Sequence, residues 1–206
     1  MTSVWLFIVA CILIIILPGP DTAVVTKNTI VHGKKQGLQT MFGICLGLLL
    51  HTAMCVAGLS ALIVKSAVAF TVLKVVGAIY LVYLGVKTLW AMRAKKSDID
   101  VETLVVPKGN SSFRQGFITN ITNPKVAVFF LTFMPQFLAT DSNPFLAFSA
   151  MGIIYAALSF VWFIFYVYLL NHIRSFMQRP VTQAVTEGLT GLVLIGFGIK
   201  LAFEKA

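Results

Sequence analysis

The sequence predicts an all-α integral membrane protein with about six transmembrane helices. Its 206 residues are 58% hydrophobic and only 11% charged, whereas a soluble domain typically carries about 25% charged residues. The apolar residues gather in about six runs, each close to the roughly 20 residues that one crossing needs. None of these runs shows the alternating pattern of a membrane barrel strand. We therefore expect a single transmembrane domain over residues 1–206.

The first apolar segment, residues 4–25, is interrupted at residues 18–21 by two prolines, a glycine and an aspartate. Proline lacks the N–H that a helix needs and clashes with the preceding turn, and a carboxylate in lipid is costly. The 14 residues 4–17 rise about 21 Å of a hydrocarbon core about 30 Å thick. We therefore expect this break toward the cytoplasmic side.

The second and third segments, residues 38–63 and 67–91, are not broken by proline. The long polar connection 93–112 follows them, with mixed charge and several turn-forming residues. It divides the domain into two halves, residues 1–92 and 113–206, with equal numbers of predicted segments.

The fourth segment, residues 115–139, contains a second break at Asn123, Pro124 and Lys125. The fifth and sixth segments cover residues 145–170 and 186–203. Because each half begins with a broken helix, the sequence predicts a 3+3 inverted pseudo-repeat of the kind that secondary transporters use. An exact inverted repeat requires both breaks near the membrane midplane; otherwise the symmetry is approximate.

Lysine and arginine fall mainly in alternate connections, which predicts the orientation. With the N-terminus outside, the cytoplasmic connections hold 10 basic residues and the outer ones hold 3, a clear positive-inside bias. The cytoplasmic set is Lys27, Lys34, Lys35, Arg93, Lys95, Lys96, Lys108, Arg114, Arg174 and Arg179, and the outer set is Lys65, Lys200 and Lys205. We expect both termini outside, and this pattern explains the net charge of +9 better than nucleic-acid binding does.

The two breaks together predict a binding site. The candidate residues are Pro18, Gly19, Pro20, Asp21, Asn120, Asn123, Pro124 and Lys125. Opposite charges at similar depth offset each other's cost. Two local alternatives stay open: Asp21 as the N-cap of a helix that restarts at Thr22, and Lys125 extending its ammonium to the inner interface. His51 is either a hydrogen-bonding residue of the bundle or a proton-handling group.

At these residues the chain resembles the LysE/RhtB superfamily of bacterial amino-acid efflux proteins, over its whole length. The matching motifs are Pro18-Gly19-Pro20, Leu73-Lys74, Gly77-Ala78, Tyr80-Leu81, Leu84-Gly85, Asn120, Thr122-Asn123-Pro124-Lys125, Phe133 and Pro135-Gln136-Phe137. The resemblance implies a secondary exporter of amino acids or close derivatives in the bacterial cytoplasmic membrane, driven by an ion gradient, with the proton as the expected coupling ion. It adds Lys74 and Gln136 to the candidates. Leu17 departs from the small or hydroxyl residue that the family often has there.

Three other functions are disfavoured. A membrane assembly or chaperone subunit without a substrate would leave Asp21 and Lys125 without a role in the bundle. A metal-ion exporter needs clustered cysteine, histidine or carboxylate ligands, whereas the three cysteines, His51 and Asp21 are dispersed along the apolar segments. A membrane enzyme is disfavoured because neither H-E-x-x-H nor G-x-S-x-G is present. We therefore expect no catalytic residue, metal or cofactor; the expected partners are an amino acid, a proton and lipid, without nucleic acid, and a homo-oligomer is compatible with the sequence.

Overall fold

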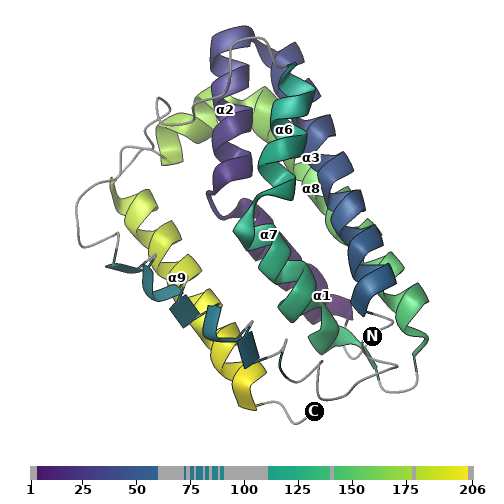
Figure 1. Ribbon diagram of the computed structural model, residues 1–206. Helices are drawn as coiled ribbons and strands as arrows, with labels where there is room; N and C mark the ends of the chain where they lie inside the picture. Colours follow the sequence, from purple (N-terminus) through teal and green to yellow (C-terminus); the bar gives the residue numbers. More distant parts are fainter. Residues whose placement is uncertain are drawn as a thin grey trace.

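The computed structural model describes residues 4–59, 111–139, 142–177 and 180–203, together with isolated positions and short stretches between 72 and 90. Every regular element in these residues is a helix (Figure 1). The predicted all-α class is therefore confirmed for the described part of the chain. Residues 93–110 of the polar connection and most of the third predicted segment lie outside it.

The N-terminal part consists of a broken helix followed by a long one. α1 (Val4–Ile16) and α2 (Pro20–His32) meet at an angle of 51° across the break. α3 (Lys34–Met54) follows and continues into the π-helical turn η1 (Cys55–Leu59). Gly33 makes the sharp turn between α2 and α3 with a φ of 87°, in the left-handed region that favours glycine.

The C-terminal part begins with a second broken helix. α6 (Ser112–Ile121) is followed by α7 (Pro124–Val128), which continues as the π-helical η2 (Phe129–Phe133) and the 3₁₀-helical η3 (Met134–Phe137). Two long helices, α8 (Pro144–Met177) and α9 (Pro180–Phe203), complete it.

Several helices extend beyond the apolar segments that predict them. α2 continues to His32 instead of ending near 25, α8 reaches Met177 instead of 170, and α9 begins at Pro180 instead of 186. Hydropathy marks only the part of a helix that can lie in hydrocarbon, whereas the backbone hydrogen bonds of a helix continue through polar residues. The predicted segments are therefore shorter than the helices.

The number of membrane crossings is established only in part. Among the described residues, 34–58 and 144–170 form helices long and apolar enough to cross, and the bent pair α1–α2 is a third if it counts as one span. The six-span arrangement and its inverted repeat stay predictions.

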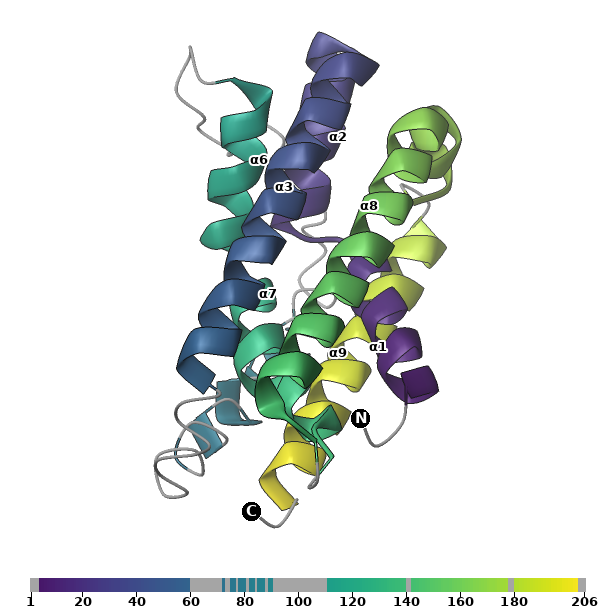
Figure 2. The same ribbon diagram turned by 90° about the vertical axis from the view of Figure 1, so that its right-hand side faces the viewer.

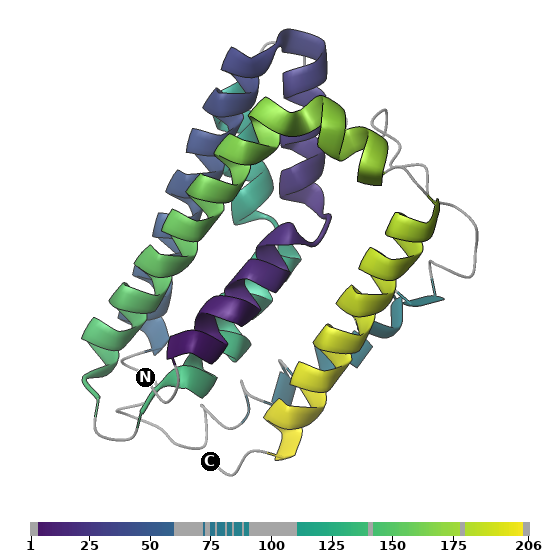
Figure 3. The ribbon, with the colours of Figure 1, turned by 180° about the vertical axis from the view of Figure 1, so that it is seen from behind.

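The two breaks lie side by side near the middle of the bundle (Figures 1 and 2). α1 and α2 have 13 residues each, so the first break is at the midpoint of the bent pair. Its depth in the membrane stays a prediction. Both chain ends lie at one end of the bundle, and the α2–α3 turn lies at the other (Figure 3).

The two ends of the bundle have different cores. Toward the chain termini, aromatic rings in contact fill the interior: Phe7 and Phe137 meet edge to face with centroids 5.2 Å apart, and Phe129 and Tyr155 stack with centroids 4.2 Å apart. Toward the α2–α3 turn the interior also holds polar contacts: Asn28 Nδ2 donates to Thr40 Oγ1 at 2.8 Å and to the Gln115 side chain at 3.1 Å. The two breaks lie between these regions.

α3 and α6 pack with their backbones in close contact. A methyl group at Gly43 would overlap the carbonyl of Phe113, and one at Gly116 would overlap the carbonyl of Thr40. Small residues permit this kind of close packing between membrane helices. Gly196 of α9, by contrast, has open space where a Cβ would stand.

Gly116→Ala is expected to destabilise the protein by about 1–3 kcal/mol, as overpacking typically does, because the added methyl group meets backbone that cannot rotate away. Gly196→Ala is the matched control. It is expected to be neutral or to stabilise by up to about 1 kcal/mol through helix propensity. Thermal unfolding of both variants in detergent measures the difference. Equal melting temperatures for Gly116→Ala and Gly196→Ala would contradict the close α3–α6 contact.

Candidate functional site

The first break exposes backbone carbonyls, and Lys125 binds them. Pro18 has no N–H, so the carbonyl of Ile14 loses its helical donor. Lys125 Nζ donates to that carbonyl at 3.1 Å and to the Leu17 carbonyl at 3.0 Å. A Cβ at Gly19 would stand 3.2 Å from Lys125 Nζ, so a side chain there would crowd the ammonium. Lys125 therefore points into the bundle, and its predicted alternative at the inner interface is wrong.

The second break is organised by the same principle. Asn123 caps α7, its Oδ1 accepting from the Lys125 backbone N–H at 3.0 Å. Pro124 removes the α-helical donor of the Asn120 carbonyl, which accepts instead from the Asn123 backbone N–H at 3.0 Å. His51 Nε2 lies 3.3 Å from this oxygen, and since a carbonyl can only accept, the imidazole donates. At each break a side chain from another helix thus binds the carbonyl that a proline has freed.

Asp21 connects the two breaks through its carboxylate. Asn120 Nδ2 donates to Asp21 Oδ2 at 2.8 Å, and Asn120 is fully buried. α2 begins at Pro20, and Asp21 is its second residue. The alternative in which Asp21 serves only as the N-cap of a helix that restarts at Thr22 is therefore wrong. The side chain instead points across the bundle to α6.

Where the two breaks meet, at the junction of Asp21, Asn120 and Asn123, several polar atoms are left without partners. Asp21 Oδ1, Asn120 Oδ1 and Asn123 Nδ2 are buried and make no hydrogen bond within the described structure. Buried polar atoms are normally hydrogen-bonded, so several such atoms at one place indicate a ligand or water site. Gly47 of α3 makes room for this junction, because a Cβ there would stand 2.5 Å from Asn120 Oδ1.

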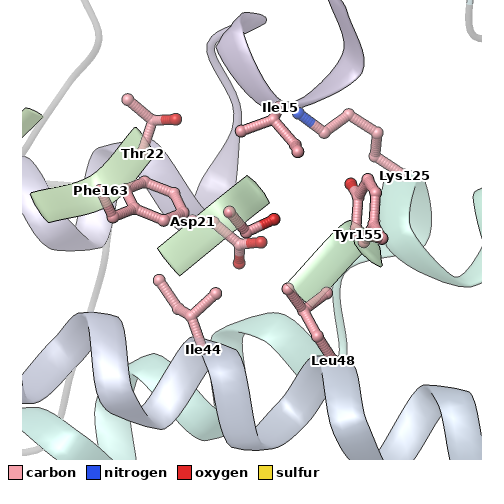
Figure 4. A pocket seen from close by; sticks show the side chains of 9 residues that line it. Ile15, Asp21, Thr22, Ile44, Leu48, Lys125, Tyr155 and Phe163 are labelled. Carbon is pink, nitrogen blue, oxygen red and sulfur yellow. The ribbon is translucent and has the colours of Figure 1, made fainter. Parts of the chain in front are cut away.

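A small cavity lies at this junction (Figure 4). Its lining comes from four parts of the chain that are distant in sequence: the first break, α3, α7 and α8. The lining residues are Ile15, Asp21, Thr22, Ile44, Leu48, Lys125, Tyr155, Ser159 and Phe163. Asp21 and Lys125 both face this cavity, yet no salt bridge joins them, because the Lys125 ammonium binds the carbonyls of Ile14 and Leu17 instead.

The other candidate residues have different surroundings. His51 is buried, stacks on Phe130 with ring centroids 5.5 Å apart, and makes the hydrogen bond within the bundle that was one of its two predicted roles. Gln136 is partly buried in η3 and does not line the cavity. Lys74 lies outside the described residues. In the described part of the chain, no three His, Cys, Asp or Glu side chains gather as a metal site would require.

The sequence interpretation missed the contribution of α8. Tyr155, Ser159 and Phe163 line the cavity and are spaced four residues apart, which places them on one helix face. Two hydroxyl residues at that spacing in a strongly apolar helix are a signal that was available in the sequence. Thr22, next to Asp21, was missed as well.

Known proteins resemble this chain over nearly its whole length. Residues 12–205 match the model of a family described as the LysE type translocator. The chain is 36% identical to the uncharacterized membrane protein YrhP of Bacillus subtilis (strain 168), over 97% of this chain and 98% of the relative. It is 32% identical to the leucine efflux protein of Salmonella typhimurium (strain LT2), over 96% and 93%, and 28% identical to that of Enterobacter sp. (strain 638), over 96% and 94%. No solved structure matches the chain.

Proposed function

Because the chain belongs to the LysE type translocator family, we propose that it exports a neutral amino acid, binding it as a zwitterion in the cavity between Asp21 and Lys125. The family and the relatives named as leucine efflux proteins make it a membrane transporter of small amino-acid substrates. The binding mode, the coupling ion and the substrate class are the proposal. A transport cycle of this kind needs no covalent chemistry.

One observation carries the binding mode: the cavity presents one unused acceptor and one unused donor of opposite charge. Asp21 Oδ1 has no partner, and the carbonyls of Ile14 and Leu17 occupy two of the three N–H groups of Lys125. An amino acid carries an ammonium that donates and a carboxylate that accepts. Its ammonium would bind Asp21 Oδ1, and its carboxylate would bind Lys125, with the unpaired Asn123 amide as a second donor. Charge-assisted hydrogen bonds of this type are among the strongest in proteins.

The two breaks supply the moving parts. Discontinuous helices in transporters expose their ends to the substrate, and one part of the bundle then moves against the other to open the site on the opposite side. In this chain the substrate would bridge α2 and α7, since Asp21 belongs to the first and Lys125 to the second. Substrate binding would therefore couple the two broken helices.

The coupling ion in this proposal is the proton, with Asp21 as its carrier. Asp21 is the one carboxylate in the lining of the cavity. Protonation would remove the negative charge that holds the substrate ammonium, so the substrate would be released when a proton arrives. A proton entering from the outside would in this way exchange for an amino acid leaving the cell.

The relatives and the cavity both favour a neutral aliphatic substrate. The leucine efflux proteins match nearly the whole chain. The wall of the cavity carries aliphatic and aromatic side chains besides the polar groups, and its only charges are Asp21 and Lys125. Because both charges are used by the zwitterion, a charged substrate side chain would find no partner there.

Transport assays in right-side-out vesicles test the function. Vesicles loaded with labelled leucine are expected to lose it faster when the outside is made acidic, and a protonophore should slow this loss. A sodium gradient imposed at constant pH tests sodium as the alternative coupling ion, and leucine loss driven by that gradient would contradict proton coupling. Equal loss from vesicles without the protein, or loss only in the presence of a metal ion, would overturn the proposal.

The proposed orientation follows from the ten-to-three distribution of basic residues between alternate connections. We expect both termini and the loop at Asp141 outside, and Lys34, the connection 93–112 and Arg174 in the cytoplasm. Single cysteines in a background without Cys11, Cys45 and Cys55 can be labelled in whole cells with a membrane-impermeant reagent. Labelling of a cysteine at position 100 from outside would show the opposite orientation and contradict the proposed one.

A further inference from the structure

The cavity has two chemically different parts. Asp21 and Lys125 bring the charges, and Thr22 and Ser159 add hydroxyl groups. Ile44 and Phe163 lie on the side away from Lys125, with Thr22 beside Phe163, whereas Ile15 lies beside the Lys125 ammonium (Figure 4). A zwitterion at Asp21 and Lys125 uses the charged part, which leaves the apolar part, beside Ile44 and Phe163, for the side chain of the substrate.

The direction of that side chain follows from the spacing along α8. Tyr155 and Phe163 are eight residues apart, or about 12 Å along the helix. In Figure 4, Lys125 and Tyr155 lie on one side of Asp21, and Phe163 lies on the other, with Ile44 and Leu48 projecting from α3 toward Asp21. A substrate whose carboxylate binds Lys125 and whose ammonium binds Asp21 therefore directs its side chain toward Phe163.

The Phe163 ring is held firmly in place. The side chain is 4% exposed, and its ring meets that of Tyr166 edge to face, at 84° with centroids 6.3 Å apart. The Tyr166 hydroxyl is in turn hydrogen-bonded to Thr26 of α2 at 2.7 Å. Ile44, on the α3 side, is fully buried. Protein interiors packed in this way yield little to a larger group.

We propose that Phe163, facing Ile44, is the residue that determines which amino-acid side chains this protein accepts, because its ring sets the length limit of the apolar part. This inference rests on the proposed function and deepens it. Aliphatic side chains such as those of valine, leucine and methionine would gain from apolar contact with these residues. Aromatic side chains are excluded by the Phe163 ring, and lysine is excluded because its ammonium would find no second carboxylate in the lining.

Two variants of Phe163 and one control test the inference. Phe163→Ala opens the end of the apolar part, and Phe163→Leu shortens the wall while keeping the core filled. Phe165→Ala removes the same ring two residues along α8, where the side chain is 58% exposed. Purified proteins in vesicles are assayed for export of leucine, phenylalanine and lysine, and the selectivity is the ratio of kcat/KM values.

Phe163→Ala is expected to raise the selectivity for phenylalanine over leucine by about tenfold or more, since a single methylene group in an apolar pocket already discriminates about 10–200-fold. Phe163→Leu should shift it in the same direction by less, and Phe165→Ala should leave it unchanged. If Phe163→Ala does not fold, the selectivity ratio of Phe163→Leu tests the inference instead. An unchanged ratio in an active Phe163 variant, or a wild-type protein that exports lysine as well as leucine, would overturn the inference and leave the proposed function standing. A wild-type protein that exports no amino acid would overturn both.

Discussion

Asp21→Asn is expected to reduce efflux by about 10²-fold or more while the protein still folds. Asparagine has the shape of aspartate, and its side-chain oxygen can accept the hydrogen bond that Asn120 Nδ2 makes to Asp21 Oδ2. What is lost is the negative charge opposite the substrate ammonium. Removing one member of a buried opposite-charge pair is worth about 3–5 kcal/mol, and about 1.4 kcal/mol corresponds to a factor of ten. Initial rates of leucine efflux, normalised to the amount of folded protein, measure the effect.

Two assays separate the roles of Asp21 in binding and in coupling. If Asp21 binds the substrate, Asp21→Asn loses both gradient-driven efflux and the exchange of labelled for unlabelled leucine. If Asp21 only carries the proton, exchange continues and gradient-driven efflux alone is lost. Asp98→Asn, in the connection predicted to be cytoplasmic, is the charge-matched control. Efflux at the wild-type rate in Asp21→Asn would remove Asp21 from the site.

Lys125→Gln is expected to abolish efflux to a similar extent and also to lower stability. The change removes the positive charge that would bind the substrate carboxylate. It also removes the donor that holds the carbonyls of Ile14 and Leu17, and an unpaired buried polar group costs about 1–3 kcal/mol. Lys125→Arg keeps the charge and the donors, so it should retain more stability and more efflux than Lys125→Gln. Efflux rates and melting temperatures of the purified variants measure both effects.

The double variant Asp21→Asn/Lys125→Gln tests through protein stability whether the two charges interact. Lys125→Gln alone leaves the Asp21 carboxylate without a compensating charge, whereas Asp21→Asn leaves Lys125 still bound to two carbonyls. The double variant is therefore expected to melt higher than Lys125→Gln alone, although it stays inactive. Strictly additive changes in stability would mean that the two charges do not interact, and the shared site would then be wrong.

Much of the site was predictable because proline and charge are rare in apolar helices. Pro18, Pro20 and Pro124 locate the breaks, since each removes a backbone donor whatever surrounds it. The positions of Asp21 and Lys125 in the sequence indicate where the cavity lies, since isolated charges in a membrane bundle are costly without a partner. Hydropathy was less informative for helix ends: α2, α8 and α9 continue through polar residues, where the backbone still hydrogen-bonds within the helix.

Composition and local chemistry alone therefore determined the helical class of the described residues, the two breaks and the residues beside them. Tertiary structure decided which groups meet there. Lys125 binds the carbonyls of Ile14 and Leu17, and Asp21 binds Asn120, 99 residues away in the sequence. It also decided that α8 completes the cavity with Tyr155, Ser159 and Phe163. Such pairings depend on how helices from distant parts of the chain pack against one another, because buried donors and acceptors select partners by proximity in the folded bundle.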